Sequence, residues 1–527
     1  MTPGTRSDSE SIGTGESIGT AVLGGGPAGL TAGYVLALKG ERGQVFEADD
    51  IVGGIARTQE VRGYRFDLGG HRFFTKLGPV EKLWHAMMGE DFLTRPRLSR
   101  IYYNQSFFAY PLVAKDVLAR LGIVESTLCA ISYLWSSAKR PFRRKEPETF
   151  EEWVTDKFGH RLYGAFFGPY TEKVWGIPGS EVRAQWAAQR IKNFSLPLAL
   201  LTILGLRRQH VTTLIEEFQY PRKGPGQMWE RFQAYLDHHD VPVNMEHRVL
   251  SIKRDGFKAT SVLLERDGEP VEVAVDAVLS SLPLSEMVLM LDPPPPEKVR
   301  AAAKRLRYRD YVLVALMTTQ SEPFPDNWIY VHDPGTRAGR VQNFGAWSPD
   351  MVKPGTTCLG VEYFCFEGDD MWEMPEQEAI EFAKAEMARI KLLDPSLVFD
   401  GVKVNVRKAY PMYDATYMEN VEVLRHYVES FGNLKTFGRN GLHRYNNQDH
   451  SMWSAILATL NLVDGTDYDV WSINTEDAYH EEGDVVDELL SIELVPPEVV
   501  EEAAEVREEE HAREGHPKPE VPSVGGR

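Results

Sequence analysis

A polar segment near the C-terminal end, Gly438–Ser451, holds the densest set of reactive side chains in the sequence. Arg439, His443, Arg444 and Tyr445 stand there with three side-chain amides, all within eleven positions. A hydrophobic core has no use for this mixture, because buried polar groups are costly without partners. Arginine and tyrosine donors suit a phosphorylated ligand. The segment therefore predicts one wall of a ligand-binding site.

A second chemical signal lies about 400 residues earlier, in the glycine-rich segment Gly24–Gly29. It fits the pattern G-x-G-x-x-G, in which Gly24 permits a tight turn, Gly26 lets a pyrophosphate approach the backbone, and Gly29 allows close helix–strand packing. Glu47 follows 18 residues after the last glycine, where an acid accepts from a ribose 2′-hydroxyl. These residues predict a dinucleotide site.

The elements needed to position this site are visible around it. Apolar Ala21–Leu23 predicts a strand that enters the glycine turn, Leu30–Leu38 has helical periodicity, and Val45 and Phe46 predict the next strand. This strand–turn–helix–strand order is that of a Rossmann-type unit.

The middle of the chain predicts two further regions. Residues 80–215 read as mainly helical, and Thr149 with Glu152 forms a predicted capping box. A basic stretch, Lys139–Lys145, is read as a solvated loop in preference to a nucleic-acid contact. Alternating apolar residues then predict several strands between 310 and 410, with one intervening helix, at Tyr311–Met317, Trp328–Val331, Leu359–Phe366 and, for the helix, Glu376–Leu393.

Size and charge narrow the classes of function. A chain of 527 residues predicts two or three domains, and the net charge of −19 argues against a general nucleic-acid or anionic membrane surface. Cys129, Cys358 and Cys365 lie far from any metal-type cluster, so no metal is predicted and a reducing cytoplasm is expected. The apolar run Phe194–Leu206 is shorter than the roughly 20 residues of a membrane span.

A second glycine pair, Gly53 and Gly54, followed by Arg57, resembles the flavoprotein superfamily of amine oxidases, protoporphyrinogen oxidases, phytoene desaturases and UDP-galactopyranose mutases. Three later pieces agree with this resemblance in order, namely Arg248-Val249, Ser280–Pro283 and Gly438-Arg439. The resemblance implies FAD in place of NAD. It also implies an α/β fold with a discontinuous Rossmann-type FAD-binding domain, a helical insert and an antiparallel β-sheet substrate domain.

The mutases within this superfamily give the more detailed match. Ile55 stands where amine oxidases commonly have arginine, and Gly70-His71 resembles the flavin-flanking histidine loop of the mutases. Tyr170–Trp175 resembles their motif Tyr-Thr-x-Lys-x-Trp, whose tyrosine lies along the nucleotide base and whose tryptophan borders the sugar. Gln185–Ile191 occupies the place of their lid, and Arg190 is the match to its diphosphate arginine.

Two later segments extend the likeness to the mutases. Tyr330 resembles a tyrosine that approaches the substrate phosphates, and Arg340 resembles the second diphosphate arginine, with Arg337 as the alternative. Tyr445 and the run Asn447–Ser451 complete the match. This run follows the tyrosine two residues sooner than it does in eukaryotic-type mutases.

The resemblance therefore implies three sets of residues. Catalytic roles fall to His71, Arg190, Arg340 and Tyr445. Substrate binding falls to Tyr170, Trp175, Arg190, Tyr330, Arg340 and Tyr445. Cofactor binding falls to Gly24, Gly26, Gly29, Glu47, Gly54, Arg57, Gly70, His71, Val249, Gly438, Arg439, Asn447 and Gln448.

The predicted division of the chain alternates between these regions. A disordered tail (1–18) precedes three FAD-binding segments at 19–80, 215–283 and 430–467. The helical substrate and lid domain covers 81–214, the β-sheet substrate domain covers 284–429, and an acidic mobile tail covers 475–527.

The leading functional hypothesis is a reduced-FAD mutase that interconverts pyranose and furanose forms of a nucleotide-diphosphate sugar. It implies a reductant such as NAD(P)H or another reductase as a partner, and it leaves homo-oligomerisation open. The alternative is an FAD-dependent oxidase or desaturase of an amine, porphyrinogen or polyene. A flavin-binding protein without chemistry is the third interpretation.

Overall fold

The structure, a computed structural model, describes residues 16–110, 120, 122–142, 146–184, 217–474 and 492–514. The chain divides into two compact units. Unit 1 comprises Met1–Gly54, Glu230–Lys304 and Val421–Trp471. Unit 2 comprises Ile55–Trp229, Arg305–Asn420 and Ser472–Arg527. Neither unit is therefore a continuous segment of sequence.

Unit 1 is built on a parallel sheet with the strand order β20-β13-β1-β2-β9. Every residue of the central strand β1 is buried. Such continuous apolar runs are typical of parallel strands that are covered on both faces. The strands are β1 (Thr20–Leu23), β2 (Gly43–Phe46), β9 (Val243–Asn244), β13 (Ala277–Ser280) and β20 (Leu434–Thr436).

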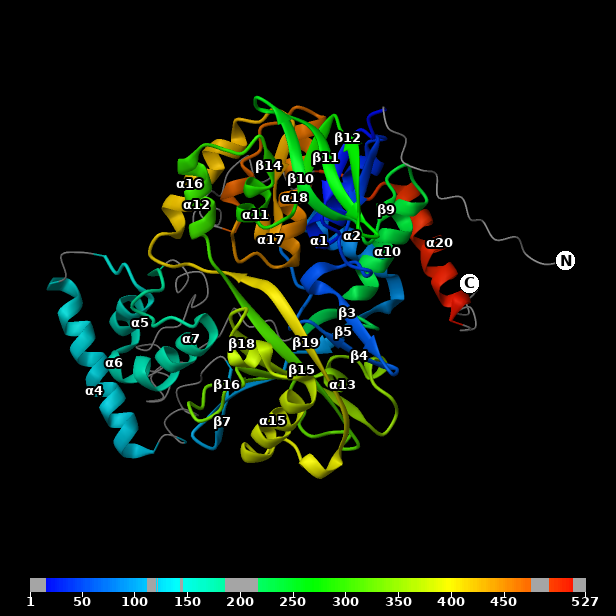
Figure 1. The fold of residues 1–527 in the computed structure, drawn as a ribbon. Helices are drawn as coiled ribbons and strands as arrows, with labels where there is room; N and C mark the ends of the chain where they lie inside the picture. Colours follow the sequence, from blue (N-terminus) through cyan, green and yellow to red (C-terminus); the bar gives the residue numbers. More distant parts are fainter. Residues whose placement is uncertain are drawn as a thin grey trace, which may run out of the picture. The chain divides into compact units, whose positions relative to one another are not determined.

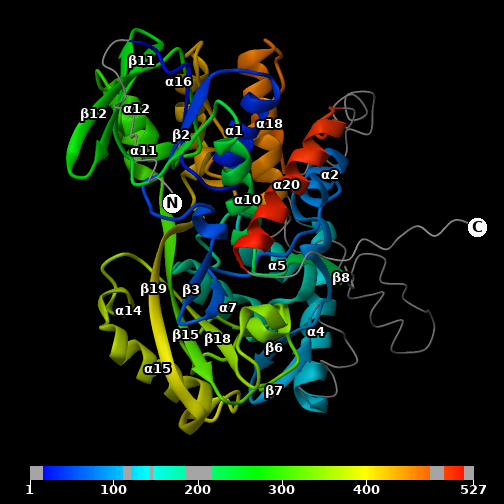
Figure 2. The same cartoon turned by 90° about the vertical axis from the view of Figure 1, so that its right-hand side faces the viewer.

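Two helices of unit 1 lie side by side, α1 (Pro27–Leu38) and α18 (Gln448–Val463) (Figure 2). Nine of the twelve residues of α1 are buried, so this helix is apolar nearly all round. Phe232 and Tyr235, from α10 (Gly226–Asp237), pack their rings against Tyr34 of α1. The cofactor turn thus precedes a helix that is fixed on several sides.

A second sheet of unit 1 has the order β12-β11-β10-β14. Its strands are β10 (Arg248–Asp255), β11 (Lys258–Arg266), β12 (Glu269–Ala274) and β14 (Leu291–Asp292). The remaining helices of this part of the chain are α11 (Leu284–Leu289), α12 (Glu297–Arg305), α16 (Tyr417–Glu429) and α17 (Gly438–Gly441).

Unit 2 contains a seven-stranded sheet with the order β19-β15-β18-β17-β16-β6-β7. All neighbouring strands are antiparallel except β16 and β6, which are parallel. The strands are β6 (Ser99–Tyr103), β7 (Ser106–Ala109), β15 (Tyr308–Thr318), β16 (Trp328–Val331), β17 (Arg340–Asn343), β18 (Thr357–Cys365) and β19 (Val398–Pro411).

The two faces of this sheet differ in chemistry, because successive strand residues point to opposite sides. One face carries Val312, Val314, Ile329, Val341 and Val361, which join the apolar core with α15 (Glu376–Arg389). The residues in register on the other face include a tyrosine, an arginine and a glutamate, namely Tyr330, Arg340 and Glu362. We refer to this second side as the polar face.

Further elements of unit 2 form two small antiparallel sheets and a set of helices (Figure 1). One is the hairpin of β3 (Thr58–Val61) and β4 (Tyr64–Asp67), and the other pairs β5 (Phe92–Pro96) with the distant strand β8 (Glu217–Pro221). The helices are α2 (Gly78–Met88), α4 (Ile123–Lys139), α5 (Phe150–Phe158), α6 (His160–Leu162), α7 (Gly168–Trp175), α13 (Phe344–Trp347), α14 (Asp370–Glu373), α15 and α20 (Pro497–Arg513).

Several local predictions are confirmed. The predicted capping box is present, because the Thr149 side chain accepts from the Glu152 backbone while the Glu152 carboxylate accepts in return. The strands expected between 310 and 410 are β15, β16 and β18, and the expected helix is α15. Cys358 and Cys365 are buried thiols on β18.

The prediction of a mainly helical region at 81–214 is wrong for its first part. Residues 92–109 form β5, β6 and β7, and the last two extend the seven-stranded sheet at one edge. Aromatic residues such as Tyr102 and Phe108 fit both a helix and a strand, so the partner strand β16 decides the outcome. Residues 185–216, including the predicted lid, lie outside the described residues.

The acidic tail at 475–527 is predicted as a mobile appendage with one short helix; a helix is present, but it is packed against its neighbours. Pro497–Arg513 forms the helix α20, which packs beside α2 within unit 2 (Figures 1 and 2). Val499, Ala503 and Val506 are buried along one side of α20. Arg507 donates to the carbonyl oxygen of Ala86. The apolar stripe at helical spacing outweighs the acidic composition of this segment.

The unit boundaries differ from the predicted segments. The hairpin β3–β4 belongs to unit 2, although 19–80 is the predicted first FAD-binding segment, and residues 284–304 belong to unit 1. Alternation along a strand does not reveal which sheet the strand joins, so sequence alone misplaces these limits. Across the described residues, none of the helices has both the length and the apolar character that a membrane span requires.

Candidate functional site

The glycine turn of unit 1 has the geometry of a dinucleotide site. Gly24 has φ +99°, which favours glycine, and a Cβ there would lie 2.5 Å from Ser281 Oγ. A Cβ at Gly29 would lie 1.7 Å from the carbonyl oxygen of Gly24. Both positions therefore require glycine, one for the turn and one for the contact between α1 and β1.

Gly26 and Gly54 face each other across the same turn. A Cβ at Gly26 would meet no atom closer than the backbone of Gly54, at 3.9 Å. A Cβ at Gly54 would in turn lie 3.4 Å from the Gly26 Cα. A backbone hydrogen bond fixes this turn, because the NH of Gly53 donates to the Gly25 carbonyl at 2.9 Å. Because neither Gly26 nor Gly54 has a side chain, the space beside them can receive a pyrophosphate.

Glu47 directly follows β2, beside this turn. Its carboxylate accepts from the backbone NH groups of Gly25, at 2.6 Å, and Asp49, at 3.0 Å. Burial raises the pKa of Glu47, and these two hydrogen bonds oppose that shift. The backbone NH of His247 donates to the Glu47 carbonyl at 2.7 Å, which holds the start of β10 and its buried Val249 in the same region of unit 1.

The segment Gly438–Ser451 lies in unit 1 and folds back on itself. Gly438 has φ +85°, its NH donates to Ser454 Oγ at 2.8 Å, and a Cβ there would lie 2.9 Å from the Ala28 Cβ. The segment therefore starts against the first turn of α1. The Arg439 guanidinium lies 4.0 Å from the centre of the Tyr445 ring and donates to the Asn446 carbonyl at 3.0 Å.

Gln448 supplies the clearest sign of a ligand-binding position among the described residues of unit 1. The residue is 8% exposed, yet both its amide nitrogen and its amide oxygen are buried without a hydrogen-bond partner among the described residues. Asn447 immediately precedes it as the N-cap residue of α18. A buried amide with two unused polar atoms is costly unless a ligand completes it. The donor and acceptor fit the polar edge of a flavin or nucleotide.

Four predicted substrate residues of unit 2 gather on or beside the polar face. Tyr330 and Arg340 lie opposite each other on β16 and β17, so both side chains point to this face. Tyr170 of α7 contacts it, with ring centres 6.1 Å apart for Tyr170 and Tyr330. Trp175 follows one helical turn later, and its ring centre lies 6.3 Å from that of Tyr410.

Arg340 is held by a carboxylate that the sequence analysis does not predict. Its NH2 group lies 2.5 Å from Glu362 Oε2 and also donates to the Tyr410 hydroxyl. Glu362 has a fully buried side chain, and its other oxygen accepts from Gln342 at 2.7 Å. The ion pair orients the guanidinium and cancels its charge locally. A lone acid in the apolar strand β18 is the available sequence signal for Glu362.

The motif Tyr170–Trp175 serves the fold as well as the site. Tyr170 stacks on His332 with ring centres 4.0 Å apart. Burial, followed by the charge of Lys173, lowers the pKa of His332 to about 3, so this ring is neutral near neutral pH. Lys173 donates to the backbone carbonyls of Val331, Asp333 and Ala338 at 2.8–3.1 Å. The lysine therefore ties α7 to the end of β16.

The loop that holds Gly70 and His71 lies against the same sheet. A Cβ at Gly70 would lie 2.7 Å from the Trp328 ring. A Cβ at Gly69 would lie 3.5 Å from both the His71 ring and the Tyr311 hydroxyl. The close approach to Trp328 explains the glycine at position 70. His71 thus belongs to unit 2, next to side chains of the polar face.

Arg72, which the sequence analysis does not single out, is the least compensated cation at this face. Its guanidinium carbon lies 3.7 Å from the centre of the Trp328 ring, and one nitrogen donates to Ser99 Oγ at 2.9 Å. Its Nε is buried without a partner in the described part of the chain. Burial lowers the pKa of Arg72 to about 10. Its position directly after His71 is the only sequence signal for it.

Three predicted residues remain, and all of them are arginines. Arg190 lies outside the described residues. Arg57 lies three residues after Gly54, in the first segment of unit 2. Arg337, the alternative to Arg340, forms a bidentate pair with the exposed carboxylate of Asp370 at 2.8 Å. Arg340 is therefore the better placed of the two arginines.

Comparisons with known proteins bear on both units. The model of the family described as flavin containing amine oxidoreductase matches residues 27–425. A Klebsiella pneumoniae protein named "Probable UDP-galactopyranose mutase" is 25% identical over 248 residues, which are 45% of this chain and 57% of that protein. The chain therefore spans little more than half the length of this curated relative.

Solved structures share the fold. A reduced UDP-galactopyranose mutase superposes with a TM-score of 0.78 at 20% identity, over 88% of this chain and 98% of that one. An Exiguobacterium protein, provisionally described as a protoporphyrinogen oxidase, gives 0.64 at 16% identity, over 85% and 98%. A putrescine oxidase bound to putrescine gives 0.55 at 16% identity, over 85% and 99%.

These matches and the glycine turn identify the cofactor as FAD. The fold is α/β, with a Rossmann-type FAD-binding domain and a β-sheet domain, as predicted. In unit 1 the residues that fit the cofactor are the Gly26–Gly54 gap for the pyrophosphate, the Glu47 carboxylate for a hydroxyl, and the incomplete Gln448 amide.

Proposed function

Because the chain belongs to the flavin containing amine oxidoreductase family and binds FAD, we propose that it is a mutase of the UDP-galactopyranose mutase type. The reaction is the interconversion of pyranose and furanose forms of a nucleotide-diphosphate sugar. The required reductant is NAD(P)H or a separate reductase.

The observation that carries this proposal is the chemistry of the polar face. Its central register row places an arginine–glutamate pair and a tyrosine between Ile101 and Leu313, and an apolar substrate would have no use for a buried ion pair there. Tyr330, Arg340 and Glu362 occupy register positions next to one another on three adjacent strands. Guanidinium and phenol donors are the groups that stabilise a leaving diphosphate.

The residues of unit 2 would divide the work. The Arg340 guanidinium, fixed by Glu362, would donate to a diphosphate oxygen from a set direction, and Tyr330 would add a hydroxyl donor. Tyr170, whose pKa burial holds well above its ordinary value, would present a neutral aromatic face to the nucleotide base. Trp175 would border the sugar, and Arg190 would close on the diphosphate.

When bound and reduced, FAD supplies the nucleophile for the anomeric carbon of the sugar. Within unit 1, Arg439, Asn447 and Gln448 would hold its ring. Tyr445 would donate its hydroxyl to a substrate phosphate. No protein nucleophile is needed, so the proposal does not depend on a Ser-His-Asp set.

The direct test is a reaction of dithionite-reduced enzyme with UDP-galactofuranose under anaerobic conditions. We expect UDP-galactopyranose to appear on anion-exchange chromatography, and the oxidised enzyme to give none. Failure of the reduced, FAD-loaded enzyme to isomerise UDP-, GDP- or dTDP-linked furanoses would refute the proposal.

The alternative function is an FAD-dependent oxidase or desaturase, and the family described as amine oxidoreductase favours it. It predicts oxygen consumption with an amine, porphyrinogen or polyene and no dependence on prior reduction. An oxygen electrode distinguishes the two functions. Flavin binding without turnover in either assay would support a protein that has lost its chemistry.

A further inference from the structure

A second group of cations extends from Arg72 toward the edge of the seven-stranded sheet. Arg97 lies just before β6, and its guanidinium carbon is 5.7 Å from the centre of the Tyr110 ring. Its Nε is buried and, like that of Arg72, has no hydrogen-bond partner among the described residues. Arg97 is close enough to Arg72 to lower the pKa of Arg72 further.

Aromatic rings connect the two arginines. The Tyr110 and Tyr330 ring centres are 4.6 Å apart, Tyr330 packs edge-on against Trp328, and Arg72 stacks on Trp328. The charge of Arg72 opposes the burial that raises the pKa of Tyr330. Two guanidinium groups and two phenol groups therefore belong to one continuous cluster.

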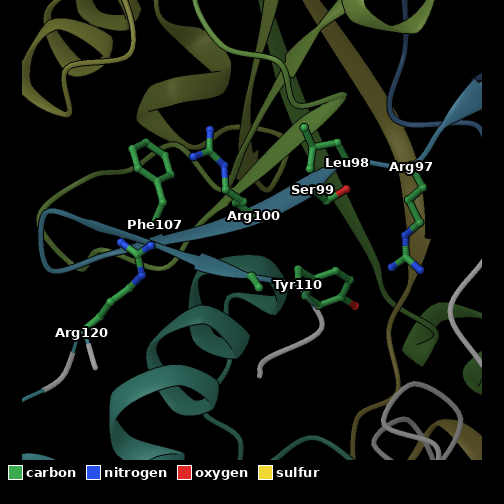
Figure 3. Close-up of a pocket in the computed structure, with 8 residues that line it drawn as sticks. Arg97, Leu98, Ser99, Arg100, Phe107, Tyr110 and Arg120 are labelled. Carbon is green, nitrogen blue, oxygen red and sulfur yellow. The ribbon is translucent and has the colours of Figure 1, made fainter. Parts of the chain in front are cut away.

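A cavity of about 320 Å³ opens beside this cluster, and its lining includes Arg97, Ser99 and Tyr110. Figure 3 shows Arg97 and Tyr110 directed toward one another, while Arg100 points away from both. Arg100 has its own counter-ion, because its guanidinium forms a bidentate pair with the fully buried Asp326, with contacts of 2.5–3.1 Å. Its charge is therefore not available to a ligand.

The contrast with the neighbouring arginines is the basis of the inference. Arg340 is neutralised by Glu362 and Arg100 by Asp326, both at short range. Arg72 and Arg97 contact no carboxylate within the described residues. Two nearby cations without a counter-ion repel one another and are expensive to bury, so such a pair is typical of an anion site.

We propose that Arg72 and Arg97 bind the diphosphate of the nucleotide substrate, with the Tyr330 and Tyr110 hydroxyls as further donors. This assignment rests on the proposed function, and it differs from the expectation that Arg340 carries the diphosphate charge. In it, Arg340 orients the ligand while Arg72 and Arg97 provide the net positive charge.

The test is calorimetric titration of the FAD-loaded, oxidised protein with UDP, uridine and inorganic pyrophosphate. Arg72→Gln and Arg97→Gln should each weaken UDP binding by about 10- to 100-fold, as expected for lost charge-assisted hydrogen bonds. Arg72→Lys keeps the charge without the fork and should lie in between. Arg407→Gln, at an exposed pair with Glu367, is the matched control and should bind like the wild type.

Flavin content and thermal unfolding of each variant establish that it is folded and loaded. Wild-type protein that binds neither UDP nor pyrophosphate would count against the proposed function itself. If Arg72→Gln and Arg97→Gln bind UDP as tightly as the wild type does, only the assignment of the diphosphate to these arginines is overturned. Weakened UDP binding with unchanged uridine binding would support it.

Discussion

The buried carboxyl of Asp67 leads to a quantitative prediction about pH. Asp67 ends β4, four residues before His71, and is fully buried. Thr58 donates to one oxygen at 2.9 Å, and the Tyr220 hydroxyl donates to the other. Burial raises the pKa of Asp67 from 3.8 to about 7, although the two hydrogen bonds oppose this shift. The carboxyl is therefore largely protonated below neutral pH.

The sign of the effect follows from proton linkage. The folded protein binds this proton between pH of about 4 and 7, whereas the unfolded chain has released it. The free energy of unfolding therefore falls as pH rises through this window. A shift of about three pKa units corresponds to about 4 kcal/mol, lost between pH 4 and pH 8.

Asp67→Asn removes the titration while keeping the shape of the side chain. We expect the variant to gain about 4 kcal/mol relative to the wild type between pH 4 and pH 8. Guanidinium unfolding, followed by tryptophan fluorescence at several pH values, measures this difference. The control is Glu367→Gln, which changes an exposed carboxylate of the same unit. Equal pH slopes for wild type and Asp67→Asn would mean that Asp67 is ionised throughout, and the reasoning would fail.

Three further predictions concern single side chains. Lys173→Met removes the donor for three backbone carbonyls and should lower the free energy of unfolding by about 3 kcal/mol in denaturant titrations, with Glu172→Gln as a neutral control. Glu362→Gln leaves the Arg340 charge uncompensated; it should cost about 3 kcal/mol of stability and strengthen pyrophosphate binding in calorimetry. Gly29→Ala forces a Cβ onto a carbonyl oxygen and should yield protein without flavin absorbance.

The cofactor turn could be predicted from sequence because its constraints are local. Gly24 needs a positive φ, and Gly29 must pack against the Gly24 carbonyl oxygen. Both requirements therefore fix the spacing between the glycines in the sequence. The acid Glu47 is fixed in the same way by the length of α1 and β2. Each of these features depends on fewer than thirty consecutive residues. Sequence patterns are most reliable for such short-range constraints.

The charge balance of unit 2 could not be predicted, because it depends on residues that are distant in sequence. Arg72 stacks on Trp328, which lies more than 250 positions later, and Arg340 finds Glu362 on the next strand of the sheet. The resemblance to the mutases assigned Arg340 to the substrate diphosphate, but it could not show that a carboxylate neutralises the charge of this arginine. The helix α20 illustrates the same limit. Its apolar stripe is buried, although the acidic composition of the segment is typical of a mobile tail.

Arg72 and Arg97, which contact no carboxylate among the described residues, also bear on the choice between a mutase and an amine oxidase. Burying Arg72 without a counter-ion lowers the stability of the ligand-free protein, and a neighbouring cation increases that cost. An amine substrate, itself a cation, would add a third positive charge and bind poorly there. A diphosphate would offset both guanidinium charges and recover the lost free energy on binding. The electrostatics of unit 2 thus favour an anionic substrate, independently of any resemblance to mutases.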